Sequence, residues 1–130
     1  MVYHRIFIDT GNSEDTYNKL TSLLGVTPTV FEKTKFSVST YDTWSYCADI
    51  ADEEPYFDFI NNFLDILEPK FNKLADLGVE KNAITFWYLY EYDQQCSMEF
   101  HPQEMKRLGE SGITLCIDCW AKSTEESTTA

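Results

Sequence analysis

Apolar and polar residues alternate in four stretches of the chain, which we expect to form strands. These stretches are residues 2–9, 43–50, 84–92 and 113–120. A repeat of two residues is typical of a strand because successive side chains point to opposite faces of a sheet. Residues 2–9 carry apolar side chains on both faces, so we place this strand inside the sheet. A fifth strand is predicted over 96–101, paired with 84–92 as a hairpin.

Two further segments have the spacing and end signals of short helices. The first begins after Ser13, a good N-cap residue, and ends at Gly25, with apolar residues at helical spacing between them. The second begins at Pro102, a residue favoured in a first turn, and ends at Gly109 or Gly112. In this second helix we expect Met105 and Leu108 to face inward.

A longer helix is predicted between these two. The sequence DEEP at 52–55 places acidic residues and a proline where a helix starts, and an apolar stripe continues from there to Gly78. Pro69 lies inside the pattern and should kink or restart the helix, because proline removes a backbone donor and crowds the preceding turn.

The strands cluster along the chain and do not alternate strictly with helices. This order favours an α+β fold with a mainly antiparallel sheet, covered by one long, Pro-kinked helix and two shorter helices. With 130 residues the chain has room for one ordinary domain, which we place at residues 1–121. Residues 122–130 are almost free of apolar side chains, so we expect a disordered tail.

Composition narrows the classes of function. A net charge of -12 disfavours binding to nucleic acid or to anionic membranes, both of which attract Lys and Arg. The chain has no apolar run of the roughly 18 residues that a membrane span needs, and its first residues do not read as a signal peptide. We therefore predict a cytoplasmic protein whose four cysteines are reduced thiols.

The acidic residues are concentrated in one segment. Residues 36–69 contain eight carboxylates and no Lys or Arg. The carboxylates are Asp42, Asp49, Asp52, Glu53, Glu54, Asp58, Asp65 and Glu68. Part of this charge has a local explanation, because acidic residues suit a helix start and the polar side of an amphipathic helix. The remaining charge, centred on residues 49–58 and accompanied by aromatic residues, would attract a basic partner.

No motif predicts catalysis or a bound cofactor. The Cys116 and Cys119 pair has the spacing of a redox or zinc motif, but residues three apart in a strand point to opposite faces, so structural cysteines are the better interpretation. An alternative function is a small-ligand or metal-binding domain that uses Glu99, His101 and Asp118. Exposed aromatic residues could instead form a self-interface in an oligomeric structural module.

Several short elements resemble a known bacterial family. They are the strand-to-helix segment that ends in LLGVTPT, including Gly25 and Pro28, then Trp44 in a strand, and the closing segment HPQEMKRLGESGITLCIDCW. Together they resemble the family of domain of unknown function 4279 over nearly the whole chain. The Lys-Gly pair that usually follows the proline is altered here, since Thr34 follows Lys33. The resemblance implies no known activity. The chain is also similar to domains found near bacterial toxin and immunity genes.

The sequence thus predicts a non-catalytic acidic binding protein, namely an immunity protein that covers the active site of a basic toxin such as a nuclease. Carboxylates would pair with Lys and Arg of the toxin, and aromatic side chains would supply contact area. The predicted partner-binding residues are Asp49, Asp52, Glu53, Glu54, Asp58, Trp44, Tyr46 and Tyr56. No catalytic residue, metal ligand or cofactor is predicted.

Overall fold

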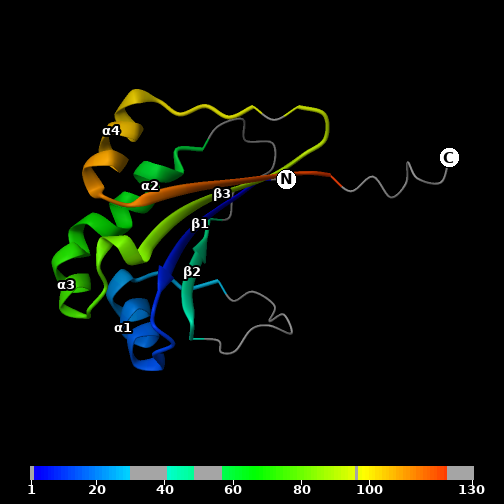
Figure 1. The fold of residues 1–130 in the computed structure, drawn as a ribbon. Helices are drawn as coiled ribbons and strands as arrows, with labels where there is room; N and C mark the ends of the chain where they lie inside the picture. The colour runs from blue at the N-terminus through cyan, green and yellow to red at the C-terminus, as the bar shows by residue number, and fades with distance from the viewer. Residues whose placement is uncertain (1, 30–40, 49–56, 96, 123–130) are drawn as a thin grey trace, which may run out of the picture.

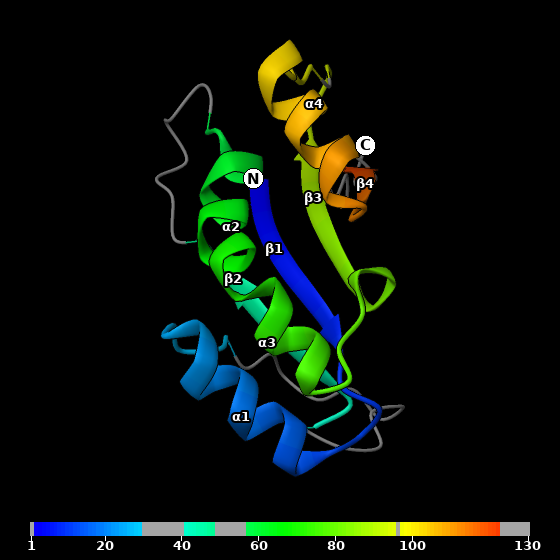
Figure 2. The ribbon, with the colours of Figure 1, turned by 90° about the vertical axis from the view of Figure 1, so that its left-hand side faces the viewer.

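The fold is a mixed β-sheet with helices on one face (Figures 1 and 2). A computed structural model describes residues 2–29, 41–48, 57–95 and 97–122. Within these residues the strands are β1 (Val2–Asp9), β2 (Thr43–Cys47), β3 (Ile84–Tyr92) and β4 (Thr114–Ala121). The helices are α1 (Glu14–Leu24), α2 (Phe59–Leu67), α3 (Phe71–Asp76) and α4 (Pro102–Ser111), with 3₁₀ turns η1 (Glu68–Lys70) and η2 (Lys81–Ala83).

The strand order is β2-β1-β3-β4, and the expectation of a mainly antiparallel sheet is wrong. β1 is antiparallel to both β2 and β3, whereas β3 and β4 are parallel. The predicted hairpin is also wrong, because residues 97–101 form no strand and lead into α4. Helix α4 is a crossover connection, which a parallel strand pair requires. Phe100 packs against Phe59 and Tyr88 under this connection.

Helix α1 forms where the sequence predicts it. Ser13 Oγ accepts a hydrogen bond from the Thr16 N–H at 3.1 Å, which satisfies one of the free donors of the first turn. Gly25 ends the helix with φ of 69°, a left-handed conformation that costs glycine little. Both predicted ends of this helix are confirmed.

The long helix is interrupted at Pro69 and begins later than predicted. α2, η1 and α3 follow one another without a break, and Pro69 lies in the 3₁₀ turn η1, so the predicted restart at this proline is confirmed. The N-cap residue of α2 is Asp58. The sequence 52–55, where we predicted the helix start, lies outside the described residues.

The core fills the space between the sheet and the helices. Its largest fully buried side chains are Trp44 from β2, Phe63 from α2 and Phe86 from β3. The ring of Phe63 lies 5.3 Å from that of Phe86, with the two planes nearly perpendicular. Edge-to-face contacts of this kind join α2 to the middle of the sheet.

Helix α4 begins at Pro102 and ends at Gly112 as expected, and Leu108 packs against the core as predicted, but Met105 does not face inward. Met105 is 51% exposed, whereas Glu104 is only 2% exposed. The Glu104 side chain folds back to the helix start, where Oε1 accepts a hydrogen bond from the His101 N–H at 2.6 Å. A reciprocal contact with the N-cap residue of its own helix explains why a carboxylate lies inside.

Of the predicted tail, residues 122–130, the structure describes only the first residue. Lys122, its first residue, donates its N–H to the Tyr92 carbonyl oxygen at 2.6 Å and so continues the pairing of β3 with β4. Residues 123–130 lie outside the described residues. Among the residues that the structure describes, we find no helix with the length and apolar character of a membrane span.

Candidate functional site

Helices α2 and α4 lie side by side and run in the same direction (Figure 2). Asp58, at the start of α2, interacts with Glu104 in the first turn of α4. Further along, Arg107 of α4 reaches Asn61, Asp65 and Glu68. The predicted acidic segment therefore continues onto a surface made by two helices that are about 40 residues apart in the sequence.

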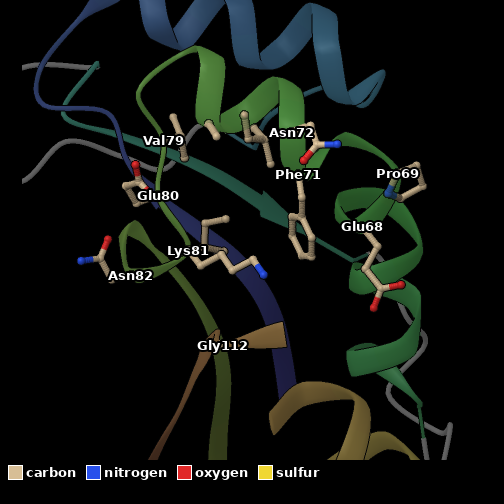
Figure 3. A pocket seen from close by; sticks show the side chains of 12 residues that line it. Glu68, Pro69, Phe71, Asn72, Val79, Glu80, Lys81, Asn82 and Gly112 are labelled. Atoms are coloured by element: carbon tan, nitrogen blue, oxygen red, sulfur yellow. The ribbon is translucent and has the colours of Figure 1, made fainter. Parts of the chain in front are cut away.

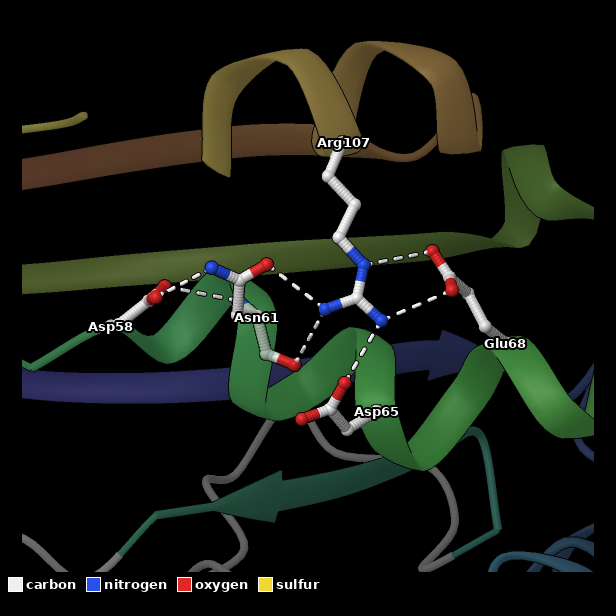
Figure 4. Close-up of polar contacts among 5 residues, drawn as sticks. All are labelled: Asp58, Asn61, Asp65, Glu68 and Arg107. Atoms are coloured by element: carbon white, nitrogen blue, oxygen red, sulfur yellow. Dashed lines mark hydrogen bonds and ion pairs between the residues drawn. The ribbon is translucent and has the colours of Figure 1, made fainter. Parts of the chain in front are cut away.

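Arg107 supplies the positive charge that residues 36–69 lack (Figure 4). Its Nε and Nη2 donate to the two carboxylate oxygens of Glu68, each at 3.0 Å. Nη2 also donates to Asp65 Oδ1 at 2.9 Å, and Nη1 donates to Asn61 Oδ1 at 2.9 Å and to the Asn61 carbonyl oxygen at 3.3 Å. A two-pronged contact between guanidinium and carboxylate is the strongest common ion-pair geometry in proteins.

The contact between Arg107 and Glu68 shifts the pKa values of both side chains. Hydrogen bonding from Arg107 holds the pKa of the Glu68 carboxyl below its usual value, and the Glu68 carboxylate in turn raises the pKa of Arg107. Asp65 and Glu68 therefore have a structural role in joining α2 to α4. Sequence reasoning missed Arg107 because nothing in the local pattern shows that α4 packs beside α2.

Asp58 also has a structural role. Its Oδ1 accepts a hydrogen bond from the Asn61 N–H at 3.1 Å, and its Oδ2 accepts one from Asn61 Nδ2 at 2.5 Å. Burial raises the pKa of Asp58, but hydrogen bonds with Asn61 and Glu104 outweigh this effect, so the pKa lies below its usual value. An ionised N-cap suits the positive end of α2.

The structure places two of the predicted aromatic contact residues in or near the core. Trp44 is 0% exposed, and its Nε1 donates a hydrogen bond to Thr21 Oγ1 of α1 at 3.1 Å. Tyr46 is half-buried, with its ring edge-on to Phe63 at 6.3 Å. Trp44 therefore presents no surface to a partner in this conformation. The other predicted residues, Asp49, Asp52, Glu53, Glu54 and Tyr56, lie outside the described residues.

The alternative set of Glu99, His101 and Asp118 is only partly brought together. His101 Nε2 lies 2.9 Å from Glu99 Oε2, and this hydrogen bond raises the pKa of His101. Asp118 lies on β4 next to Ile117, and adjacent strand residues point to opposite faces, so its side chain leaves the helix-covered face. Within the described ranges, no group of three or more His, Cys, Asp or Glu residues has the arrangement to hold a metal ion.

No disulfide joins the cysteines that the structure describes. They are Cys47, Cys116 and Cys119. Cys116 and Cys119 both lie in β4, three residues apart in an extended strand. Their side chains therefore point to opposite faces, as expected from the sequence.

The fold and this surface define a small α+β protein with a four-stranded mixed sheet among its described residues and, on one face, a pair of helices that Arg107 joins through carboxylates. A family model described as Domain of unknown function (DUF4279) matches residues 3–122. The chain belongs to this family, as its sequence elements indicate. No curated protein and no solved structure matches it.

The contribution of Arg107 to stability is testable. We expect Arg107→Met to lower the free energy of unfolding by about 1–3 kcal/mol, because several charge-assisted hydrogen bonds are lost and two carboxylates are left unbalanced. Water around Asp65 keeps the loss within this range. Urea unfolding followed by circular dichroism measures it.

Lys106→Met is the matched control for this change. Lys106 lies on the same helix and carries the same charge, but its ion pair with Glu110 is 3.9 Å long and both side chains are exposed. We expect this variant to stay within about 0.5 kcal/mol of the parent. Equal losses in the two variants would show that Arg107 acts only through net charge.

Proposed function

We propose that the chain is a non-catalytic binding protein, an immunity protein that neutralises a basic bacterial toxin through an acidic surface at the start of α2. The observation that supports this most is the charge on the α2 and α4 pair. The side chains of Asp65, Glu99 and Glu110 are 72%, 76% and 68% exposed, Arg107 faces carboxylates of its own chain, and Lys106, 78% exposed, pairs with Glu110. This surface borders the segment 49–56 in the sequence, which adds four more carboxylates.

The structural roles of Asp58, Asp65 and Glu68 leave a smaller set of residues that can contact a partner. Asp58 caps α2, and Asp65 and Glu68 bind Arg107, so these three carboxylates are already engaged. Asp49, Asp52, Glu53 and Glu54 carry the proposed recognition of toxin Lys and Arg residues. Tyr46 and Tyr56 are the remaining aromatic candidates, because Trp44 is in the core.

A basic toxin domain fits the charge of the whole chain. With a net charge of -12, the protein attracts a positively charged partner over distances longer than direct contacts. Such attraction raises the association rate and makes it sensitive to salt. A nuclease is a fitting partner because its active site must itself attract a polyanion. Covering that site requires no chemistry from the immunity protein.

The test first asks whether the open reading frame beside this gene encodes a basic toxin domain, and then measures how that domain binds the double variant Glu53→Lys, Glu54→Lys. We expect the variant to bind at least tenfold more slowly at low salt, with a weaker dependence of the rate on salt. The control is Asp93→Lys, Asp118→Lys, which makes the same charge change at two exposed positions away from α2. Surface plasmon resonance at several salt concentrations measures both variants.

Three results bear on the proposal. A loss confined to the Glu53 and Glu54 variant supports it. Equal losses in both variants would show that only the total charge matters, which contradicts an interface at the start of α2. Unchanged affinity and salt dependence in both variants, or no binding by the parent protein, would rule out the acidic surface as the toxin-binding site.

A further inference from the structure

The two edge strands of the sheet differ in how well they are covered. β2 is five residues long, and none of its residues is exposed. The Thr29 N–H donates a hydrogen bond to the Ser45 carbonyl oxygen at 2.7 Å, and Thr29 Oγ1 accepts one from the Cys47 N–H at 3.1 Å. The segment after α1 therefore covers the outer side of β2.

β4, the other edge strand, is open. It is eight residues long, and six of these residues are exposed. The sheet ends at β4 in the described part of the chain. Residues 97–101 form no strand beside it, and Phe100 turns to the helix-covered face to pack on Phe59 and Tyr88. Lysines, prolines and short length usually protect an edge strand, but β4 has no lysine or proline, and Asp118 is its one charged residue.

Exposed apolar side chains gather along this edge. In the described ranges four large hydrophobic residues are exposed, namely Phe7, Met105, Ile117 and Trp120, at 38%, 51%, 46% and 37%. Ile117 and Trp120 lie on β4. Met105 precedes Arg107 by two residues on α4, which is about 200° around the helix, so it points away from the α2 side that Arg107 contacts.

Helix α4 lies beside β4 because the chain turns sharply between them. Only Gly112 and Ile113 separate the two elements, and Gly112 makes the turn with φ of 75° at the rim of the cleft drawn in Figure 3. α2 lies over the middle of the sheet, where Phe63 contacts Phe86 of β3. α4 therefore lies on the β4 side of α2 (Figure 2), and Met105 points toward the open edge.

This edge has little of the charge that keeps copies of the chain apart. Asp118 is the one acidic residue in 112–121, although the chain contains 22 Asp and Glu residues and has a net charge of -12. A basic partner is attracted to other parts of the surface, since this edge offers it a single carboxylate. An apolar strand with almost no charge is the better match, and a second copy of this chain supplies one.

We propose that two copies of this chain pair through β4 in antiparallel orientation, which joins the four described strands of each copy into one continuous sheet. A two-fold axis perpendicular to the sheet relates the copies, so their helices lie on the same face of the joint sheet. The paired backbones form roughly six to eight hydrogen bonds. This surface is separate from the proposed toxin-binding surface and does not depend on it.

One register suits both the length and the charge of the strand. Residues on the same face must lie opposite each other, so the longest pairings are centred on Ile117, over residues 114–120, or on Asp118, over residues 115–121. The second register places two carboxylates opposite each other, which destabilises a strand pair. The proposed register is therefore centred on Ile117, with Leu115 opposite Cys119 on the helix-covered face.

Sedimentation velocity of the full chain tests this pairing, in a reducing buffer that prevents disulfides between copies. We expect a dimer with a dissociation constant on the order of 10 µM, since the interface is small. The dimer fraction should rise with salt, because salt screens the repulsion between two acidic chains. Binding to a basic toxin should weaken with salt, so the two associations are distinguishable.

Ile117→Lys and Phe7→Lys are the matched variants. Each replaces an exposed apolar residue of a strand with a lysine, but Phe7 lies on β1, inside the sheet. Ile117→Lys places two lysines opposite each other at the two-fold axis, so it should weaken the dimer at least about tenfold. Phe7→Lys should leave the dissociation constant unchanged. Circular dichroism checks that both variants are folded.

A parent protein that stays monomeric up to about 1 mM would overturn the proposal. So would a dimer that Ile117→Lys weakens no more than Phe7→Lys does, because that result places the interface elsewhere. Hydrogen exchange of the parent protein tests the edge without a variant. The β4 amides that do not bond to β3 should exchange more slowly at high protein concentration than at low concentration, and equal rates would also overturn the proposal.

Discussion

Trp44→Ala is expected to lower the free energy of unfolding by about 3–5 kcal/mol, the range measured when a large buried aromatic side chain is removed from a core. Trp44 is fully buried in β2, opposite Ile8 of β1. The change also leaves Thr21 without the hydrogen bond that the indole donates. Urea unfolding followed by circular dichroism measures the loss.

Trp120→Ala is the control for this prediction. Trp120 is 37% exposed on the edge strand β4, and its Nε1 donates a hydrogen bond to an exposed Glu91 side chain at 3.2 Å. We expect a loss below about 1 kcal/mol. If Trp44→Ala lowered the free energy of unfolding no more than this control does, Trp44 would not be a core residue. It would then again be a candidate for contact with a partner. A large loss would assign Trp44 to the core.

Acidification from pH 7 to pH 4 is expected to remove up to about 3 kcal/mol of stability through His4 alone. His4 packs among the rings of Phe57, Phe59 and Tyr88, with centroid distances of 5.2, 4.9 and 5.1 Å. Burial lowers its pKa from 6.5 to about 4. Between these values the unfolded chain binds a proton that the folded protein does not bind, so stability falls as the pH falls.

The measurement is the free energy of unfolding in urea at several pH values between 7.5 and 4, for the parent and for His4→Phe. The variant keeps an aromatic ring and cannot be protonated, so its stability should fall less over this range. His101→Gln is the control: the pKa of His101 is raised, so its contribution is present at low pH and is lost as the pH rises. Identical pH profiles for the parent and His4→Phe would contradict the prediction.

The carboxyl groups act in a different pH window from His4. Asp58 and Glu68 have lowered pKa values, so their contribution to stability is present above the ordinary carboxyl pKa and disappears at lower pH. Their loss therefore falls mainly below about pH 4, where most of the His4 effect has already occurred. Both proteins contain the same carboxyl groups, so the difference between their pH profiles of unfolding free energy gives the contribution of His4 alone.

Local signals in the sequence predicted the elements that depend on local chemistry. Ser13 and Gly25 mark the ends of α1 because caps act within a few residues. Pro69 marks the restart within the long helix for the same reason. The alternation of apolar residues identified all four described strands, although the strand predicted over residues 96–101 was not found.

The features that the sequence did not reveal depend on contacts between distant segments. The direction of β4 follows from the crossover through α4, which alternation alone does not specify. The pairing of Arg107 with Glu68 spans 39 residues and exists only because α4 packs beside α2. Glu104 was missed because a buried carboxylate is rare, and its contacts with the start of its own helix and with Asp58 make burial possible.

The place of β1 in the sheet has a consequence for how the protein is made. β1 leaves the ribosome before the other three described strands, yet it lies inside the sheet, and its partner β3 pairs Tyr90 with Val2. Every residue up to β3 must therefore be synthesised before β1 can pair with β3. Pairing between strands so far apart in the sequence favours slow folding. Until β3 has been synthesised, the edge of β1 that β3 covers is unpaired and depends on the rest of the nascent chain, or on chaperones, for protection.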